Sequence, residues 1–130
     1  MAEEKTHKIL IIDDDEFLLD MYALKFKERG AQVEAFQSGA AALTHIRDGY
    51  VPDALIVDIV MPEMDGFEIL KTIKQEGLIK PVIIVLSNQG QDSDIERAKE
   101  LGAHGYIIKA NAVPSEVIEE SLLILKEHGL

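Results

Sequence analysis

Short apolar runs alternate along the chain with longer stretches in which apolar residues recur every three or four positions. Four of these runs are almost continuously apolar, over residues 9–12, 55–57, 82–86 and 106–108. Strands that are covered on both faces need such runs, so the four are predicted to be central strands of a parallel sheet. A fifth run, Gln32–Phe36, alternates polar with apolar residues and is predicted to lie at an edge of the sheet.

The stretches between the runs have the spacing of amphipathic helices. The first stretch ends at Gly30, a typical residue after a helix C-terminus, and carries four apolar residues at helical spacing: Leu18, Met21, Tyr22 and Phe26. Further helices are predicted over 40–48, from Asp65 or Gly66 to residue 76, over 92–101 and over 114–127, where Pro114 suits a first turn. Five strands alternating with five helices predict an α/β fold.

Composition adds the expectation of one compact domain. The chain has 130 residues, of which 47% are hydrophobic, enough for one buried core but cramped for two. We expect a single domain over residues 1–130, with its core over about 7–128 and no separate output domain. No repeat, linker or low-complexity segment interrupts the pattern.

Charge and residue usage narrow the classes of partner and compartment. The formal net charge is -11, which opposes direct binding to nucleic acid or anionic lipid and favours proteins or cations as partners. The chain has no cysteine, so disulfides and thiolate metal sites are excluded. No apolar run approaches the ~18 residues of a membrane helix, and residues 1–8 are too polar for a signal peptide. A cytoplasmic location without membrane contact is expected.

Charged and polar residues end four of the five predicted strands. The first strand is followed by Asp13 and Asp14, the third by Asp58, the fourth by Ser87 and the fifth by Lys109. Parallel α/β sheets place their ligand sites outside the carboxyl ends of the strands, so these side chains are expected to converge. Each residue alone has an ordinary explanation, as a helix cap, a turn residue or an exposed strand terminator.

The convergent set has the chemistry of phosphoryl transfer to a carboxylate. Two carboxylates ~4 Å apart repel each other by roughly 4 kcal/mol at an effective dielectric of 20, so three need a cation to stay ionised. Mg²⁺ is the natural candidate, because it prefers oxygen ligands. Asp58 is placed to act as the nucleophile that forms an acyl phosphate. Lys109 and Ser87 would then neutralise and hydrogen-bond the phosphoryl oxygens.

Three segments closely resemble the receiver domain of two-component response regulators: 10–16 (LIIDDDE), 52–66 (PDALIVDIVMPEMDG) and 105–109 (GYIIK). The resemblance spans nearly the whole chain. It implies a flavodoxin-like (βα)5 fold, a doubly wound five-stranded parallel sheet with strand order 2-1-3-4-5.

The resemblance also assigns roles around the acceptor. It implies that Asp58 is the phosphoacceptor and that a Mg²⁺ or Mn²⁺ ion is bound by Asp58, Asp14 directly, Asp13 mainly through water, and the backbone carbonyl of Val60. The domain is not expected to act as an enzyme on other molecules; it would catalyse only its own phosphorylation and dephosphorylation.

A switch and its partners follow from the same resemblance. Ser87 and Lys109 are implied to contact the phosphoryl oxygens, and Tyr106 to turn inward when Ser87 is recruited. The implied donor is a sensor histidine kinase or a histidine phosphotransfer protein, and the implied output is a contact with a downstream protein. A homodimer through the fourth helix, fifth strand and fifth helix is compatible with this class. In that helix, Leu123 and Ile124 lie outside the predicted core stripe and are candidates for a partner surface.

Three positions depart from the commonest family pattern. Ala110 follows Lys109 where proline is usual, which leaves the geometry of that peptide bond open. Asn88 stands where small residues are common, and either contributes a hydrogen bond or serves as a turn residue. Val60 places an apolar side chain near the path of an attacking water, from which we predict slow loss of phosphate from Asp58.

Two alternatives remain open at this point. Asp13 and Asp15 also fit the Asp-x-Asp opening of haloacid-dehalogenase-like phosphatases, with Asp13 as nucleophile. No acidic pair follows Lys109 as that family requires, and Asp58 would have no role. The chain could also be a receiver fragment of a larger regulator or hybrid histidine kinase. The four histidines show no metal-ligand spacing and are expected to have ordinary structural roles.

Overall fold

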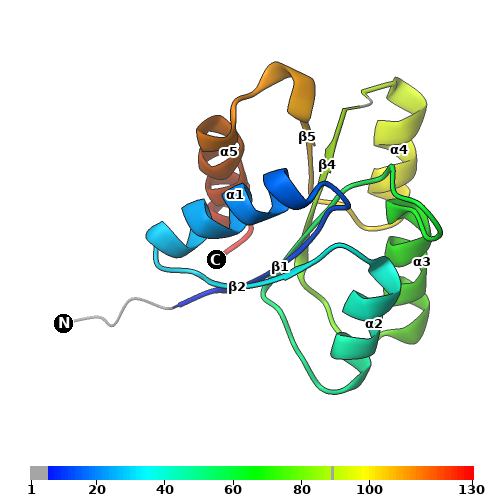
Figure 1. Ribbon diagram of the computed structural model, residues 1–130. Helices are drawn as coiled ribbons and strands as arrows, with labels where there is room; N and C mark the ends of the chain where they lie inside the picture. Colours follow the sequence, from blue (N-terminus) through cyan, green and yellow to red (C-terminus); the bar gives the residue numbers. More distant parts are fainter. Residues whose placement is uncertain (1–5, 89) are drawn as a thin grey trace.

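The computed structural model describes residues 6–88 and 90–130, so residues 1–5 of the polar N-terminal segment lie outside the described part. Strands and helices alternate regularly along the chain (Figure 1). The elements are β1 (Lys8–Ile12), α1 (Glu16–Glu28), β2 (Gln32–Phe36), α2 (Gly39–Arg47), β3 (Ala54–Val57), α3 (Gly66–Glu76), β4 (Val82–Ser87), α4 (Asp92–Glu100), β5 (Gly105–Ile108), a 3-10 turn (Lys109–Asn111) and α5 (Pro114–Glu127).

The strands form one parallel sheet in the order β2-β1-β3-β4-β5. Helices α1 and α5 lie on one face of the sheet and α2, α3 and α4 on the other (Figure 1). This is the doubly wound, flavodoxin-like arrangement that the resemblance implied, with the predicted strand order. All strands run the same way, so their carboxyl ends share one edge of the molecule.

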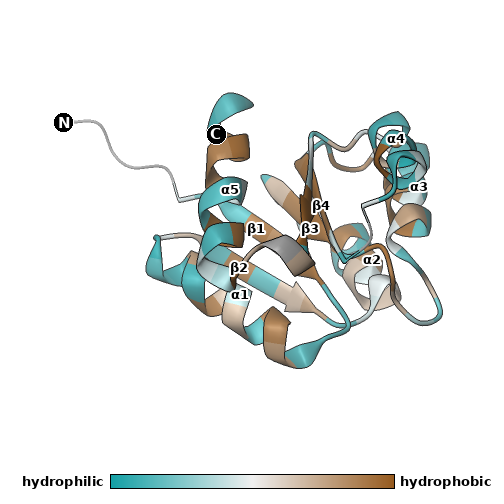
Figure 2. Cartoon of the chain, turned by 90° about the horizontal axis from the view of Figure 1, so that it is seen from above, coloured by the Kyte–Doolittle hydropathy of each residue, from teal (hydrophilic) through white to brown (hydrophobic). Residues whose placement is uncertain are grey.

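Alternate residues of each central strand face opposite layers, which gives the protein two cores. Leu10 and Ile12 of β1 face α2 and α3, whereas Ile9 and Ile11 face α1 and α5. The central strands β3 and β4 are accordingly mostly hydrophobic, β2 at the edge also carries hydrophilic residues, and the helices turn hydrophilic sides outward (Figure 2). The prediction of central strands from nearly continuous apolar runs is therefore confirmed for β1, β3 and β4.

The prediction that residues 106–108 form a central strand is wrong, because β5 lies at the edge beside β4. Only Ile107 of this strand is buried, and its neighbours Tyr106 and Ile108 are partly exposed. Strand β5 carries apolar residues on both faces because helices pack against both of them. It has a neighbouring strand on one side only. The predicted edge position of β2 is confirmed.

Helix α5 places its two candidate surface residues differently. Leu123 is 57% exposed, as predicted for a surface residue. Ile124 is partly buried and packs against Gly105 of β5, where an added Cβ would come within 2.7 Å of its Cδ1 atom. Only Leu123 is therefore an exposed apolar residue on this turn of the helix.

The remaining differences lie at element ends. Helix α2 begins at Gly39, one residue before the predicted start, because the Ser38 side chain accepts a hydrogen bond from the Ala41 N–H as N-cap. Strand β4 extends to Ser87, which pairs with Ile108. No helix in the described residues is both long and apolar enough to cross a membrane.

Candidate functional site

The predicted strand-end residues meet at the carboxyl edge of the sheet. Asp13 follows β1, Asp58 follows β3, Ser87 ends β4 and Lys109 follows β5. Asp13 is 1% exposed, Asp58 7% and Ser87 0%, although none of the three belongs to an apolar residue type. Buried polar side chains of this kind must be paired, so their burial indicates a built site rather than exposed strand terminators.

Lys109 bridges the two buried carboxylates. Its Nζ lies 2.5 Å from Oδ2 of Asp13 and 3.1 Å from Oδ2 of Asp58, and its side chain is 7% exposed. Asp13 and Lys109 are separated by 96 positions in the sequence. The ammonium therefore joins β1, β3 and β5 at one point through charge-assisted hydrogen bonds.

Burial and charge act against each other in this network. Burial raises the pKa of Asp58, the Lys109 ammonium lowers it, and the neighbouring Asp13 carboxylate raises it again, with a net upward shift. Burial disfavours the charged form of Lys109, but its hydrogen bond to Asp13 and the charges of both carboxylates outweigh burial and raise the pKa of Lys109. One ammonium thus leaves the carboxylates incompletely compensated.

A cation would complete the charge balance. One carboxylate oxygen from each of Asp13, Asp14 and Asp58 can be chosen so that all lie within 4.8 Å of one another, with Asp14 exposed at the mouth. Three ionised carboxylates and the Lys109 ammonium together leave a net charge of −2. An oxygen donor set with this charge fits a hard divalent ion such as Mg²⁺. Within the described residues, no histidine belongs to such a group.

The backbone fixes both buried carboxylates in place. Asp13 N–H donates to the Phe36 carbonyl, and Asp58 N–H donates to the Ile12 carbonyl, so both residues extend the sheet's hydrogen bonding beyond the strands. Asp58 Oδ1 accepts from the Val60 N–H at 3.2 Å, and Asp13 Oδ1 accepts from the Asp15 N–H at 3.0 Å. Each carboxylate therefore has one oxygen held by its own loop and the other held by Lys109.

The three acidic residues after β1, Asp13, Asp14 and Asp15, have different roles. Asp15 is the N-cap of α1, and its Oδ1 accepts from the Leu18 N–H at 3.1 Å. The helix-cap explanation is thus correct for Asp15, while Asp13 turns into the site and Asp14 stays exposed beside it. One local sequence feature serves both a helix start and the acidic cluster.

Ser87 and Tyr106 lie on neighbouring strands, with Ser87 paired to Ile108 and Tyr106 to Val85. Burial raises the pKa of the Tyr106 phenol, and a hydrogen bond with the Ser87 side chain opposes that rise. The predicted switch pair is therefore in contact in the structure. The rearrangement of this pair on phosphorylation stays a prediction.

Two residues near the site were not recognised from the sequence as parts of it. A Cβ added to Gly66 would lie 2.4 Å from the Asp58 carbonyl oxygen and 2.8 Å from Ile59 Cα, so only glycine lets α3 start against the end of β3. Tyr22 was recognised only as an apolar residue of the first helix. Burial raises its pKa, Lys109 lowers it, and Asp13 and Asp58 raise it, so its phenol lies within electrostatic range of the site.

The three positions that depart from the family pattern, Val60, Asn88 and Ala110, all lie within the described residues. Asn88 is exposed, Val60 is 52% exposed, and no peptide bond in the described residues is cis, so Lys109 and Ala110 are joined by a trans bond. Lys109 nevertheless reaches both carboxylates. The alanine at position 110 is thus compatible with the predicted placement of the lysine.

Comparison with known proteins gives a consistent result. A family model described as the response regulator receiver domain matches residues 9–120. The chemotaxis protein CheY of Bacillus subtilis is 38% identical over 104 residues, covering 79% of this chain and 85% of that protein. The transcriptional regulatory protein PhoP of the same species is 30% identical over 119 residues, covering 92% of this chain but 48% of PhoP.

Solved structures agree with the fold. The chemotaxis protein CheY4 of Vibrio cholerae superposes with a TM-score of 0.83 at 25% identity, covering 92% of this chain and 99% of that one. A CheY-like receiver protein from Methanospirillum hungatei gives a TM-score of 0.82 at 25% identity, covering 95% and 96%. The chain spans half or less of the length of several curated relatives that it matches.

Proposed function

Because this chain belongs to the family of response regulator receiver domains, we propose that it is a signalling switch controlled by phosphorylation of Asp58. The observation that supports this most strongly is the position of the Asp58 carboxylate. It is 7% exposed, one oxygen is held by the Val60 N–H, and the other lies 3.1 Å from an ammonium beside a second buried carboxylate. A buried carboxylate so oriented is suited to act as a nucleophile.

In the proposed reaction, an Asp58 oxygen attacks the phosphorus of a phosphohistidine on a sensor kinase or phosphotransfer protein. The new P–O bond forms as the P–N bond breaks, and the imidazole leaves with the electron pair and takes up a proton. A bound Mg²⁺ or Mn²⁺ would neutralise charge on the phosphoryl oxygens. Lys109 is within reach to pair with one of these oxygens, and the Ser87 hydroxyl to hydrogen-bond another.

The donor protein has an apolar rim on which to dock. Phe17 at the start of α1 is 70% exposed, Val60 after β3 is 52% exposed and Val113 before α5 is 55% exposed. All three lie on segments that follow strand carboxyl ends, around the mouth of the site. Exposed apolar side chains of this kind suit a transient protein contact rather than a small substrate.

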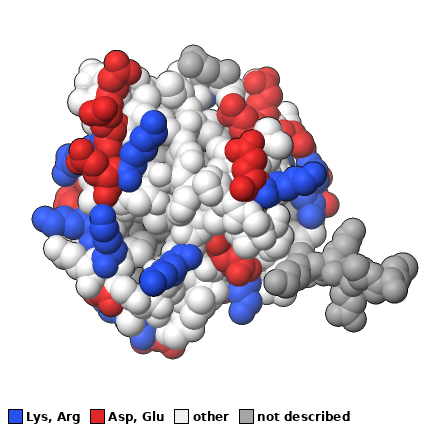
Figure 3. All heavy atoms as spheres, turned by 180° about the vertical axis from the view of Figure 1, so that it is seen from behind, with Lys and Arg blue, Asp and Glu red and all other residues white. Residues whose placement is uncertain are grey.

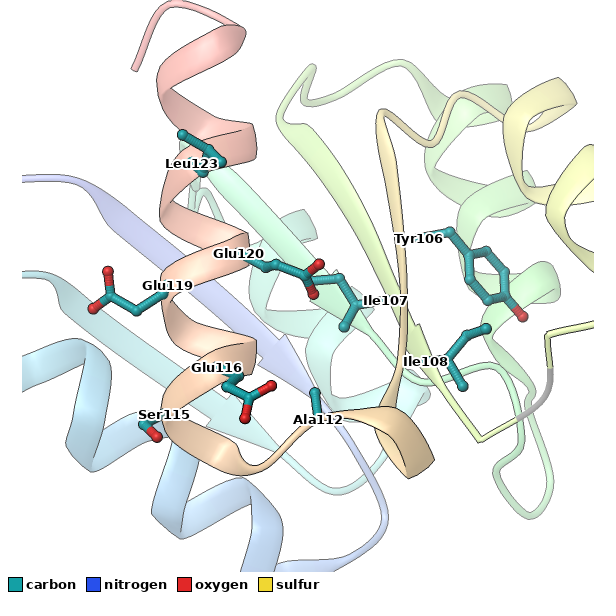
Figure 4. A pocket seen from close by; sticks show the side chains of 9 residues that line it. All are labelled: Tyr106, Ile107, Ile108, Ala112, Ser115, Glu116, Glu119, Glu120 and Leu123. Atoms are coloured by element: carbon teal, nitrogen blue, oxygen red, sulfur yellow. The ribbon is translucent and has the colours of Figure 1, made fainter.

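The proposed output face is the groove between β5 and α5. It has a volume of about 750 Å³ and is lined by Tyr106, Leu123 and three glutamates of α5. Glu116 and Glu120 point toward β5, whereas Glu119 points toward α1, where it pairs with Arg29 (Figure 4). Seen from behind, the middle of the molecule is largely uncharged, and charged side chains gather on both sides of it (Figure 3). Because Tyr106 also contacts Ser87, a change at the site can reach this groove.

The central test is intact-mass measurement after incubation with acetyl phosphate and Mg²⁺. The wild type is expected to gain one phosphoryl group, and Asp58→Asn to gain none. Asp58→Asn also separates the alternatives, since a haloacid-dehalogenase-like phosphatase would use Asp13 as its nucleophile and has no use for Asp58. Equal labelling of the wild type and Asp58→Asn would overturn the proposal.

The output face is tested by self-association on phosphorylation, because α4, β5 and α5 are the proposed dimer surface. Leu123→Glu is expected to abolish any phosphorylation-dependent dimer in sedimentation measurements. Leu24→Glu is the matched control, since Leu24 is 58% exposed on α1, which is not part of the α4–β5–α5 surface. A phosphorylation-dependent dimer that persists in Leu123→Glu would exclude this surface as the dimer contact.

The lifetime of the phosphate is a further proposed property. Val60 donates its N–H to Asp58 and holds an exposed apolar side chain at the mouth. An apolar group there offers no hydrogen bond to an attacking water, so slow self-dephosphorylation is expected. A half-life of seconds without a phosphatase would contradict it. Cytoplasmic location and the absence of enzyme activity on other substrates stay predictions.

A further inference from the structure

A second hollow lies at the opposite edge of the sheet from Asp58. Its volume is about 330 Å³, which is at the lower end of the range for small-molecule sites. It lies where α3 and α4 end and β4 begins. Its floor is apolar and is formed by five large aliphatic side chains: Leu70, Ile73, Ile79, Ile83 and Leu101.

The charges around this hollow oppose those of the molecule as a whole. Lys74, Lys80 and His104 line it, and none of its lining residues is Asp or Glu. The chain has a net charge of -11, and the groove between β5 and α5 is lined by three glutamates. An apolar floor with only basic groups at its margin suits an anion that carries an apolar body.

Lys80 is the cation available to such an anion. Lys74 donates to the Glu100 carbonyl at 3.0 Å and so is engaged at the C-terminus of α4. Lys80 is exposed, and within the described residues it makes no ion pair. A partner at Lys80 would therefore not have to displace an existing carboxylate.

His104 is oriented by the backbone. The ring Nδ1 of His104 accepts a hydrogen bond from the Ile83 N–H at 3.0 Å, and the backbone N–H of His104 donates to the Ile83 carbonyl at 2.7 Å. A neutral imidazole that accepts at Nδ1 carries its proton on Nε2, so the ring is fixed as an N–H donor. The hollow is thus lined by a neutral imidazole and by the exposed ammonium of Lys80.

We propose that this hollow binds a small amphipathic carboxylate, whose apolar body lies on the aliphatic floor and whose carboxylate pairs with Lys80. At roughly 30 Å³ for each non-hydrogen atom, the volume holds about ten such atoms. A medium-chain fatty acid has this size and polarity. The site is separate from Asp58, so the proposal does not depend on phosphorylation.

Octanoate is the probe that tests this site, with chemical shifts of the isotope-labelled protein as the readout. Titration is expected to give saturable shifts at Ile79, Ile83 and Leu101, in the wild type and in Asp58→Asn alike. Lys80→Glu is expected to weaken octanoate binding by about tenfold or more, because the ion pair becomes a repulsion. Lys80→Gln should lie between the two.

Two controls separate this binding from general adsorption. Lys71→Glu is the matched variant, because Lys71 is also an exposed lysine but lines the neighbouring α3–α4 groove and not this hollow. It should bind octanoate as the wild type does. Octyltrimethylammonium has the same tail and the opposite charge, and should bind Lys80→Glu better than the wild type.

The proposal fails if octanoate gives no saturable shifts at these three residues. It also fails if Lys80→Glu and Lys71→Glu weaken binding equally, or if the cationic amphiphile binds the wild type as tightly as octanoate does. None of these outcomes bears on Asp58, which is tested by its own labelling experiment.

Discussion

Lys109 carries the electrostatics of the site at the scale of a single residue. It is the cation between two carboxylates that are themselves almost fully buried. Removing one partner of a buried ion pair leaves an uncompensated charge, which costs far more than the loss of an exposed pair. The stability of the unphosphorylated protein should therefore depend on this side chain.

Lys109→Ala is expected to lower the free energy of unfolding by about 3 kcal/mol, measured by urea denaturation near neutral pH without divalent ions. Asp58→Asn in the same chain should recover part of that loss, because it removes one of the two facing carboxylates. If Lys109→Ala and the double variant were equally stable, the carboxylate repulsion would not be the cause.

His104 makes the stability depend on pH. Burial, and then the charge of the neighbouring His128, lowers the pKa of His104 from 6.5. As pH falls below 6.5 the unfolded chain takes up the proton first, so stability is lost between that value and the lower folded pKa. Protonation of Nδ1 would also break its hydrogen bond with the Ile83 N–H.

His104→Asn is expected to remove part of the loss of stability on acidification, because the Asn side-chain oxygen can accept the same hydrogen bond without titrating. Urea unfolding at about pH 7.5 and about pH 5.5 measures the difference. His7→Asn serves as the control and should keep the wild-type slope. An unchanged slope in His104→Asn would show that other groups cause the pH dependence.

At the scale of elements, the junction between β3 and α3 sets the position of Asp58. Helix α3 begins at Gly66 with its backbone against that of Asp58 and Ile59. Asp65 and Glu68 form a capping box that fixes the start of the helix. A change at this helix start is therefore transmitted directly to the proposed acceptor.

Gly66→Ala is expected to destabilise the protein by about 1–3 kcal/mol, because the new methyl group has only backbone atoms to displace. The labelling rate of the folded fraction by acetyl phosphate should fall as well, since Asp58 must shift. Wild-type stability together with wild-type labelling would mean that the helix start moves away freely.

Most of the fold could be predicted from the sequence, because β1, β3 and β4 are buried on both faces and read as apolar runs. The apolar run of β5 misplaced that strand, since its residues face helices on both sides although the strand is at an edge, where the strand order implied by the resemblance puts it. Ile124 was taken for a surface residue because helical spacing alone does not show that Gly105 leaves room for it.

The polar residues of the site were predictable for a simple topological reason. Parallel strands bring their carboxyl ends together, so residues far apart in sequence, such as Asp13 and Lys109, must meet. The parts played by Gly66 and Tyr22 were not recognised, because a close backbone approach and the distance of a core phenol from the charged cluster depend on packing rather than on the pattern of residue types.

At the scale of the whole molecule, acidic charge favours cations in general, and the site has to select a divalent one. Salt screens the self-repulsion of a chain with net charge -11. A specific Mg²⁺ site must therefore be distinguished from screening by its dependence on individual carboxylates. Asp14 and Asp15 allow this comparison because they are adjacent and both exposed.

Mg²⁺ is expected to raise the free energy of unfolding more than sodium chloride does at equal ionic strength, by about 1.4 kcal/mol at ten times its dissociation constant. Asp14→Asn should remove this difference. Asp15→Asn changes the charge equally and keeps the helix cap of α1, so it should retain it. Equal behaviour of the two variants would mean that Mg²⁺ acts only by screening.

The bridge made by Lys109 also bears on how the protein is produced in the cell. An internal cation already holds the buried carboxylates. We therefore expect a newly synthesised chain to fold without free magnesium. If phosphorylation of Asp58 needs the ion, as proposed, magnesium shortage would stop signalling while the receiver stays folded and ready for the ion's return.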